Sequence, residues 1–227
     1  IPQDMNSTPG AQLRGVSQST YFLHNVNSYN EGAIGRDMVP LKDGEKVGVI
    51  GGGNVAMDAA RTAIRLGADV TVLYRRTQED MPAIKAEYEQ AVNEGVKFRW
   101  NTSVTEFIAG ENGRLSACRL NTPKGETIEP FDRIYLAIGS RPANRIVSTT
   151  EGIEVDEKGY VKVVDFPFGM TTRRGVFAGG DVVHRPQTVV LAMKAAKDVA
   201  QGIAQYVDAI KLLEAAKKVE ELHSVDK

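Results

Sequence analysis

The segment at residues 47–60, VGVIGGGNVAMDAA, constrains the fold more than any other part of the chain. An apolar run at 47–50 has the composition of a buried β-strand and ends in three consecutive glycines. Small and apolar residues then recur at helical spacing as far as Gly67, which is a natural helix end. The segment therefore predicts a strand, a tight glycine turn and a helix that packs closely on the strand.

The glycine turn matches the spacing G-x-G-x-x-A, which is the fingerprint of a dinucleotide-binding unit. Gly51 permits the tight turn, Gly53 leaves room for a pyrophosphate beside the backbone, and the small Ala56 lets the helix approach the strand. The free N–H groups and the positive dipole end of the helix would face the phosphates. We therefore expect a nucleotide site here, and the alternative is a glycine turn with a structural role only.

The end of the next predicted strand, at residues 69–74, indicates which dinucleotide such a site prefers. An NAD site usually carries a carboxylate there, which accepts a hydrogen bond from the ribose 2′-hydroxyl. This chain has Arg75 and Arg76 instead, and guanidinium groups bind phosphate through paired hydrogen bonds. The pair predicts NADP(H), and the alternative is two solvated arginines on an exposed loop.

Further apolar runs at 96–100 and 133–138 and a helical pattern at 83–94 continue the alternation of strands and helices. This alternation predicts a parallel sheet with right-handed crossovers. Between residues 103 and 129 the runs are short and separated by turns, which indicates an antiparallel meander. The expected fold class is α/β, with a Rossmann-like parallel sheet and an antiparallel β-meander insertion.

The last third of the chain predicts a short strand at 175–178 and a long helix at 189–207. The strand leads into Gly180 and Asp181, and a carboxylate at this place can accept hydrogen bonds from sugar or ribitol hydroxyls. The N-terminal amides of the helix would point at an electron-rich ring edge. The alternative is an aspartate in a tight glycine turn without a ligand.

Several motifs occur together in one order along the chain: GGGNVAMDAAR, YRR followed by DMPA, NEGV, AIGSRP and GVFAGGD. In this set, from about residue 13 to 207, the chain resembles the glutamate synthase small (beta) subunit family. Members of that family are NADPH-dependent, FAD-containing oxidoreductases and flavoproteins with two dinucleotide-binding domains. The resemblance implies an NADPH domain inserted into an FAD domain, and a cytoplasmic protein.

The resemblance also implies roles for particular residues, all of them in cofactor binding. No catalytic side chain is expected, because the cofactors carry the chemistry of hydride transfer. The expected residues are Gly51, Gly52, Gly53, Asn54, Val55 and Ala56 for the NADPH pyrophosphate, Arg75 and Arg76 for its 2′-phosphate, Gly139 near its nicotinamide, and Gly180, Asp181, Thr188 and Val189 for the flavin.

The same resemblance divides the chain into a connecting segment of the FAD domain at 1–35, the NADPH-binding domain at 36–145 and a C-terminal segment of the FAD domain at 146–227. Residues 1–45 hold neither a second glycine fingerprint nor a cysteine-rich iron–sulfur segment. We therefore expect the C-terminal part of a longer protein, with an incomplete FAD-domain segment. The helix predicted at 189–207 would then have one uncovered side, or a side covered by a second copy in a homodimer.

The composition excludes several other classes of protein. The chain has 227 residues, 42% of them apolar, and a formal net charge of −1, which fits a folded domain without an excess of cations for nucleic acid. The sequence contains no run of about 18 apolar residues, so it predicts no membrane-spanning helix. Cys118 is the single cysteine and is expected in the core, and His24, His184 and His223 lie far apart in sequence, so we expect no metal site from this chain.

Two classes of function stay open from the sequence. In the first, the intact protein passes a hydride from NADPH to FAD, and electrons go on to an iron–sulfur partner or a large catalytic subunit. That partner belongs to glutamate synthase or to a hydrogenase-type, transhydrogenase-type or pyrimidine-reducing relative. In the second, the isolated chain is a nucleotide-binding module without chemistry, because its FAD site is incomplete.

Overall fold

The computed structural model describes residues 1–142, 145–184 and 188–225, and the chain divides into two compact units. The first unit is Pro2–Gly139, and the second is Ser140–Lys227 together with Ile1. Among the described residues, no helix combines the length and the apolar composition needed to cross a membrane.

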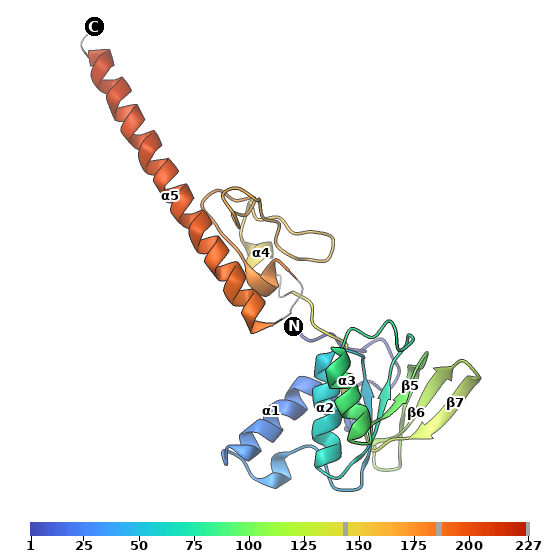
Figure 1. Cartoon of the computed structure of the whole chain (residues 1–227). Helices are drawn as coiled ribbons and strands as arrows, with labels where there is room; N and C mark the ends of the chain where they lie inside the picture. The colour runs from blue at the N-terminus through green and yellow to red at the C-terminus, as the bar shows by residue number, and fades with distance from the viewer. Residues whose placement is uncertain (143–144, 185–187, 226–227) are drawn as a thin grey trace. The chain divides into compact units, whose positions relative to one another are not determined.

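A five-stranded parallel sheet forms the centre of the first unit, with the strand order β1-β8-β2-β3-β4. Its strands are β1 (Val16–Gln18), β2 (Lys46–Ile50), β3 (Asp69–Leu73), β4 (Lys97–Arg99) and β8 (Arg133–Leu136). The helices of this unit are α1 (Ser19–Asn30), α2 (Asn54–Arg65) and α3 (Lys85–Asn93), with a short 3-10 helix η1 (Arg36–Met38) between α1 and β2 (Figure 1).

A second, antiparallel sheet is inserted between β4 and β8. It consists of β5 (Ser103–Ala109), β6 (Leu115–Thr122) and β7 (Gly125–Pro130) in sequential order. The prediction of a parallel sheet with an antiparallel meander insertion is therefore confirmed.

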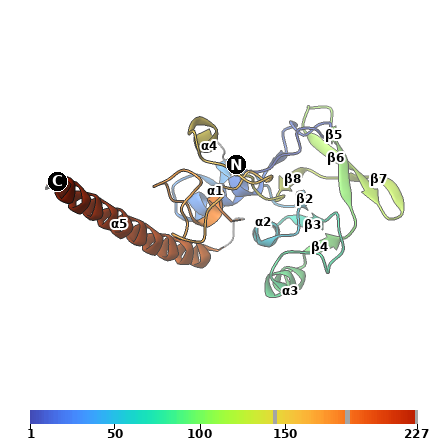
Figure 2. The same cartoon turned by 90° about the horizontal axis from the view of Figure 1, so that it is seen from above.

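The first unit has three layers, and its parallel sheet is the middle one. Helices α1, α2 and α3 lie on one face of the sheet and β5–β7 on the other (Figure 2). Because successive side chains on a strand point to opposite faces, the central strands β2, β3 and β8 contribute to both cores. On β8, Tyr135 packs with the helices, whereas Ile134 and Leu136 pack with the meander around the buried Cys118.

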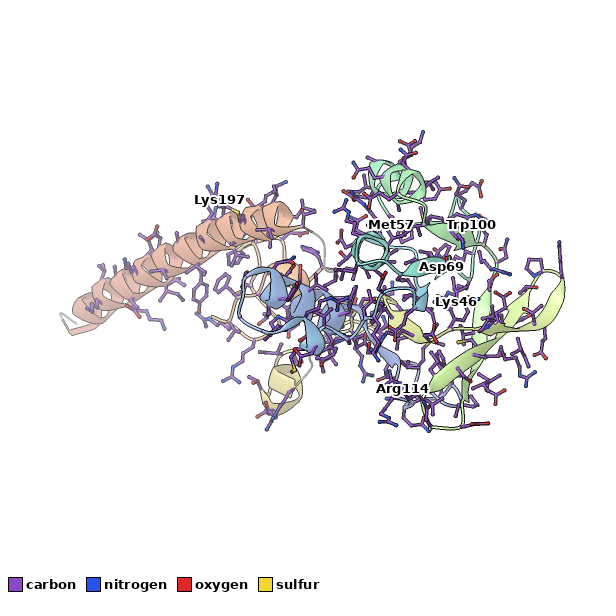
Figure 3. The ribbon with its side chains drawn as sticks, turned by 90° about the horizontal axis from the view of Figure 1, so that it is seen from below. Lys46, Met57, Asp69, Trp100, Arg114 and Lys197 are labelled. Carbon is purple, nitrogen blue, oxygen red and sulfur yellow. The ribbon has the colours of Figure 1, made fainter. Side chains whose placement is uncertain are left out.

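Small side chains let α2 lie close to the sheet. Its buried positions are Ala56, Met57, Ala59, Ala60 and Ala63, so four of the five are alanines; Figure 3 labels Met57. This helix follows β2 directly, and its N-terminus is therefore held at the carboxyl edge of the sheet.

The stretch at 1–35, expected as a connector of another domain, contributes β1 and α1 to the first unit. Strand β1 pairs in parallel with β8, and α1 packs on the sheet through Phe22. The Phe22 ring stacks on the Tyr135 ring, with 4.3 Å between the two ring centroids. Both rings are fully buried. The stretch therefore packs on the parallel sheet of the first unit, while the boundary at residue 36 and the assignment to an FAD domain stay predictions.

The second unit contains the short helix α4 (Arg145–Thr149), the 3-10 turn η2 (Gly180–Val182) and the long helix α5 (Val189–Val225). The strand predicted at 175–178 is present only as a single bridge, between Met170 and Phe177. The backbone around Phe168 lies so close to α5 that a Cβ atom at Gly202 would collide with it. The helix is longer than the predicted 189–207 and includes most of the tail.

Helix α5 leaves an apolar face exposed. Val189, Met193, Ile203 and Val207 share one face by helical spacing, and their exposed fractions range from 41% to 76%. The uncovered side expected for this helix is therefore present in the chain as described.

Removing the Phe22 ring will test whether α1 is part of the first unit. We expect Phe22→Ala to lower the free energy of unfolding by about 3 kcal/mol or more, because it leaves a cavity against Tyr135. Tyr21→Ala, at a neighbouring side chain that is 54% exposed, should change it by less than about 1 kcal/mol. Equal urea midpoints for the two variants would contradict this packing.

Candidate functional site

The turn after β2 begins with a glycine that no other residue can replace without strain. Gly51 has φ +142°, and a Cβ atom there would collide with the carbonyl oxygen of Ala137, just beyond β8. Its own N–H donates to the carbonyl of Leu73 on β3, at 3.2 Å. The turn is therefore wedged between the ends of the two neighbouring strands.

The two following glycines differ in what surrounds them. A Cβ atom at Gly52 would lie 2.6 Å from the ring of Tyr74, so the protein itself requires a glycine there. Gly53 has an ordinary extended backbone, with φ −92° and ψ 177°, and a Cβ atom there would meet nothing within 4 Å. The space beside Gly53 is open to a group from outside the chain, as the fingerprint predicts for a pyrophosphate.

Helix α2 begins at this open space with unpaired donors. Gly53 is its N-cap and supplies no side-chain bond, while the N–H groups of Ala56 and Met57 donate to the Gly53 carbonyl at 2.9 and 3.2 Å. The N–H groups of Asn54 and Val55 precede these bonds and have no carbonyl in the helix to donate to. An anion placed here would receive their hydrogen bonds and the positive end of the helix dipole.

The two arginines that follow β3 are free to bind an anion. Both Arg75 and Arg76 are exposed, and among the described residues neither guanidinium has a hydrogen-bond or ion-pair partner. Since Ile50 and Leu73 are partners in the parallel register, β2 and β3 end at the same edge of the sheet. The glycine turn and the arginine pair are therefore neighbours at that edge.

Gly139 lies near the end of the adjacent strand β8, also in the first unit. It has φ +89°, and its carbonyl accepts a hydrogen bond from the N–H of Gln3 at 2.9 Å. The N-terminal residues thus line this end of the edge. Three of the predicted groups, the glycine turn, the arginine pair and Gly139, accordingly follow adjacent strands.

The remaining predicted residues lie in the second unit, around the start of α5. Gly180 has φ +69°, and Asp181 beside it is exposed without a hydrogen-bond partner among the described residues. An open pocket of about 340 Å³ lies between η2 and the first turns of α5; its lining is Phe168, Gly180, Asp181, His184, Leu191, Ala192, Lys194, Ala195 and Asp198.

Thr188 acts as the N-cap of α5. Its carbonyl accepts hydrogen bonds from the N–H groups of Leu191 and Ala192, each at 3.1 Å. Val189, the first helical residue, is 76% exposed. The Gly180–Asp181 turn therefore lies beside a helix start, which is the arrangement that the sequence predicts for contacts to a polar ring edge or to hydroxyl groups.

Charged side chains of α2 link this helix to α3. Arg61 pairs with Glu87 at 2.6 Å and with Glu94 at 2.9 Å, which ties α2 to α3. Partial burial, and then the nearby Glu87, raise the pKa of Asp58, while Arg61 lowers it. These groups need no ligand to explain them.

The single cysteine carries no reactive thiolate. Cys118, on strand β6 of the meander, is fully buried, and this burial raises its pKa to about 12, so the thiol stays protonated at neutral pH. Within the part of the chain that the structure describes, no three His, Cys, Asp or Glu side chains gather as metal ligands would.

Sequence reasoning missed two contacts of the site, both made by residues of the loop between β3 and α3. The side-chain oxygen of Asn54 accepts a hydrogen bond from the N–H of Ile84 at 2.9 Å, and the hydroxyl of Tyr74 donates to the carbonyl of Asp80 at 2.9 Å. The DMPA motif marks the loop in the sequence, but nothing in its spacing indicates that it folds back on the glycine turn.

Comparison with known proteins identifies the family. Residues 5–196 match the model of the pyridine nucleotide-disulphide oxidoreductase family, which is most of the chain. The chain therefore belongs to this family, in agreement with the parallel sheet, its glycine turn and the antiparallel insertion.

The relatives include the small chain of NADPH glutamate synthase from Halomonas elongata, which is 35% identical over 88% of this chain and 46% of its own length. The corresponding Escherichia coli protein is 33% identical over 73% of this chain and 39% of its own length. The beta subunit of an NADP(+)-dependent formate dehydrogenase from Moorella thermoacetica is 35% identical over 75% of this chain and 26% of its own length. The chain thus spans half or less of the length of these relatives.

Among solved structures, the thioredoxin reductase of Lactococcus lactis has the same fold. It matches with a TM-score of 0.71 and 24% identity, over 92% of this chain and 64% of its own. This likeness supports the Rossmann-type architecture and extends through both units.

Replacing two glycines by alanine will separate the structural glycine from the open one. We expect Gly51→Ala to lower the free energy of unfolding by more than about 2 kcal/mol, because of its positive φ and the collision with Ala137. Gly53→Ala should lower it by less than about 1 kcal/mol, since a Cβ atom there meets no neighbour. Urea unfolding of both variants measures this, and a Gly53→Ala loss as large as that of Gly51→Ala would contradict it.

Proposed function

We propose that the first unit binds NADP(H) at the carboxyl edge of its parallel sheet. The observation that carries this proposal is the exposed and unpaired Arg75–Arg76 pair beside the open Gly53 turn. A pyrophosphate fits the open space and the first amides of α2, and a 2′-phosphate fits the two guanidiniums, which bind phosphate bidentately. The NADPH and NADP(+) in the names of relatives support the same preference.

The intact protein, we further propose, is an NADPH-dependent flavoprotein oxidoreductase of the cytoplasm. The chemistry that its bound groups supply is hydride transfer between the nicotinamide and FAD, with electrons passing on to an iron–sulfur partner or a large catalytic subunit. In the second unit, the unpartnered Asp181 and the start of α5 at Thr188 and Val189 fit the hydroxyl groups and the ring of a flavin. The small-chain relatives support a larger partner, and a hydrogenase- or transhydrogenase-type system is the alternative within this class.

The part of this chain in the chemistry is to bind and to orient. The glycine turn removes side chains from the path of the phosphates, and the arginines neutralise the charge of the third phosphate. Gly139 leaves the edge after β8 without a side chain where we place the nicotinamide end. No side chain of the chain is required as an acid or a base.

Nucleotide titration tests the first proposal. We expect NADPH to bind at least about tenfold more tightly than NADH, because only NADPH offers a charged partner to the guanidiniums. The double change Arg75→Ala and Arg76→Ala should remove most of this difference and leave NADH binding unchanged. Arg174→Ala, which removes one exposed arginine of the second unit, is the control for loss of a positive charge away from the site. Tighter binding of NADH to the unchanged chain would refute the proposal.

A second candidate function is a nucleotide-binding module that has no flavin and performs no chemistry. It is favoured for the 227-residue chain by the coverage of less than half of the glutamate synthase small chains.

We expect the purified 227-residue chain to bind NADPH and to lack the visible absorption of flavin, because it spans less than half of the length of its glutamate synthase small-chain relatives. The measurement is the absorption spectrum of the chain before and after incubation with FAD and gel filtration. FAD retained in equimolar amount would contradict the module and favour the complete oxidoreductase.

A further inference from the structure

The loop between the arginine pair and α3 is closed by a side-chain staple directly after Arg76. One carboxylate oxygen of Asp80 accepts hydrogen bonds from the hydroxyl of Thr77 at 3.0 Å and from its N–H at 3.4 Å. The N–H of Met81 donates to the carbonyl of Gln78 at 3.1 Å, so residues 78–81 form a tight turn. This staple fixes the backbone on the C-terminal side of the arginines.

The same loop makes hydrogen bonds to residues that directly follow β2 and β3. The Tyr74 hydroxyl donates to the carbonyl of Asp80, and the Tyr74 ring is the one that lies against Gly52. At the far end of the loop, the N–H of Ala83 donates to the carbonyl of Gly52 at 3.0 Å, and the N–H of Ile84 donates to the Asn54 side chain. The loop thus reaches from the end of β3 to the glycine turn and the start of α2.

The backbone of the arginine pair is also held from the side of β4. The N–H of Tyr74 donates to the carbonyl of Arg99, and the N–H of Asn101 donates to the carbonyl of Arg76, both at 2.9 Å. Arg75 and Arg76 therefore lie in a short stretch with fixed backbone on both sides, while their side chains remain exposed. Fixing the backbone before binding reduces the entropy lost when the guanidiniums engage a phosphate.

We propose that residues 77–84 form a coenzyme clamp, which Asp80 from within and Asn54 from the start of α2 hold in place as positioning residues, so that Arg75 and Arg76 are ready for a 2′-phosphate. This inference rests on the proposed NADP(H) site. Asp80 contributes through the Thr77 staple and not by contact with the ligand, since its carboxylate would repel a phosphate. Asn54 begins α2, at the pyrophosphate position, so the clamp connects the two phosphate positions of one ligand.

The clamp makes a ligand that carries a 2′-phosphate and a 5′-phosphate bind more tightly than one that carries only a 5′-phosphate. The probes are therefore adenosine 2′,5′-bisphosphate and 5′-AMP, which differ only in the 2′-phosphate. The ratio of their dissociation constants, measured by titration calorimetry on the full chain, reports the contribution of the arginine pair. A merely structural role of Asp80 would lower both affinities together and leave the ratio unchanged.

We expect Asp80→Ala to reduce this ratio about tenfold with little change in 5′-AMP binding, because the guanidiniums lose their fixed backbone. Asp80→Asn, which keeps an acceptor for Thr77, should restore most of the ratio. Glu79→Ala is the matched control, since Glu79 is an adjacent exposed carboxylate without a hydrogen-bond or ion-pair partner among the described residues. It should leave the ratio unchanged or raise it slightly, by removing a negative charge.

Fluorescence of Trp100, the only tryptophan of the chain, gives an independent readout. Its ring lies edge-on to the ring of Tyr74, with 6.2 Å between the two ring centroids. Trp100 directly follows β4 and is labelled in Figure 3. Thr77→Val removes only the staple hydroxyl and provides a second variant if Asp80→Ala lowers the urea midpoint. In that variant, adenosine 2′,5′-bisphosphate should produce a smaller emission change at saturation than in the unchanged chain, and the dissociation-constant ratio should fall.

The outcomes separate the clamp from the site on which it rests. If the unchanged chain shows no preference for adenosine 2′,5′-bisphosphate, the proposed NADP(H) site is wrong. If it shows the preference and both Asp80→Ala and Thr77→Val retain the full ratio, the site stands and the clamp is overturned. A reduced ratio in these two variants, with Glu79→Ala unchanged, supports the clamp.

Discussion

The close approach of the Gly51 backbone to the end of β8 is the constraint on which the rest of the first unit depends. Strand β2 lies between β3 and β8 in a fully parallel sheet, so the chain must leave its carboxyl end through a gap bounded by neighbouring backbone. Only a glycine with positive φ passes there. That exit determines where α2 begins, and the start of α2 in turn determines where an anion finds free N–H groups.

The three glycines of the turn have different physical roles, although they are the same residue type. Gly51 avoids a backbone collision, Gly52 makes room for the Tyr74 ring, and Gly53 faces open space. The first two make the turn and its neighbour β3 into one rigid edge. Only the third is unexplained by the protein itself, which is why it points most directly to a ligand.

Much of the fold was predictable, because strands buried on both faces and an alanine-rich helix produce strong local patterns. Strands β2, β3, β4 and β8, helices α2 and α3, and the meander all appear near their expected residues. Strand β1 was not predictable, since its three residues, VSQ, carry no strand pattern of their own and pair only because β8 has an unpaired edge. The opposite error occurred at 175–178, where an apolar run without strand neighbours forms only one bridge.

The sequence by itself determined the glycine turn, the arginine pair after the next strand and the family to which their order points, because each depends on residue type and spacing within a short segment. Only the tertiary structure decided that Asn54 receives the N–H of Ile84 and that Asp80 closes a staple beneath Arg76. It also decided that α1 packs on Tyr135, more than 100 residues away along the chain. Such contacts arise from the parallel sheet, which brings the ends of separate strands to one edge, and no local pattern in the sequence records which residues meet there.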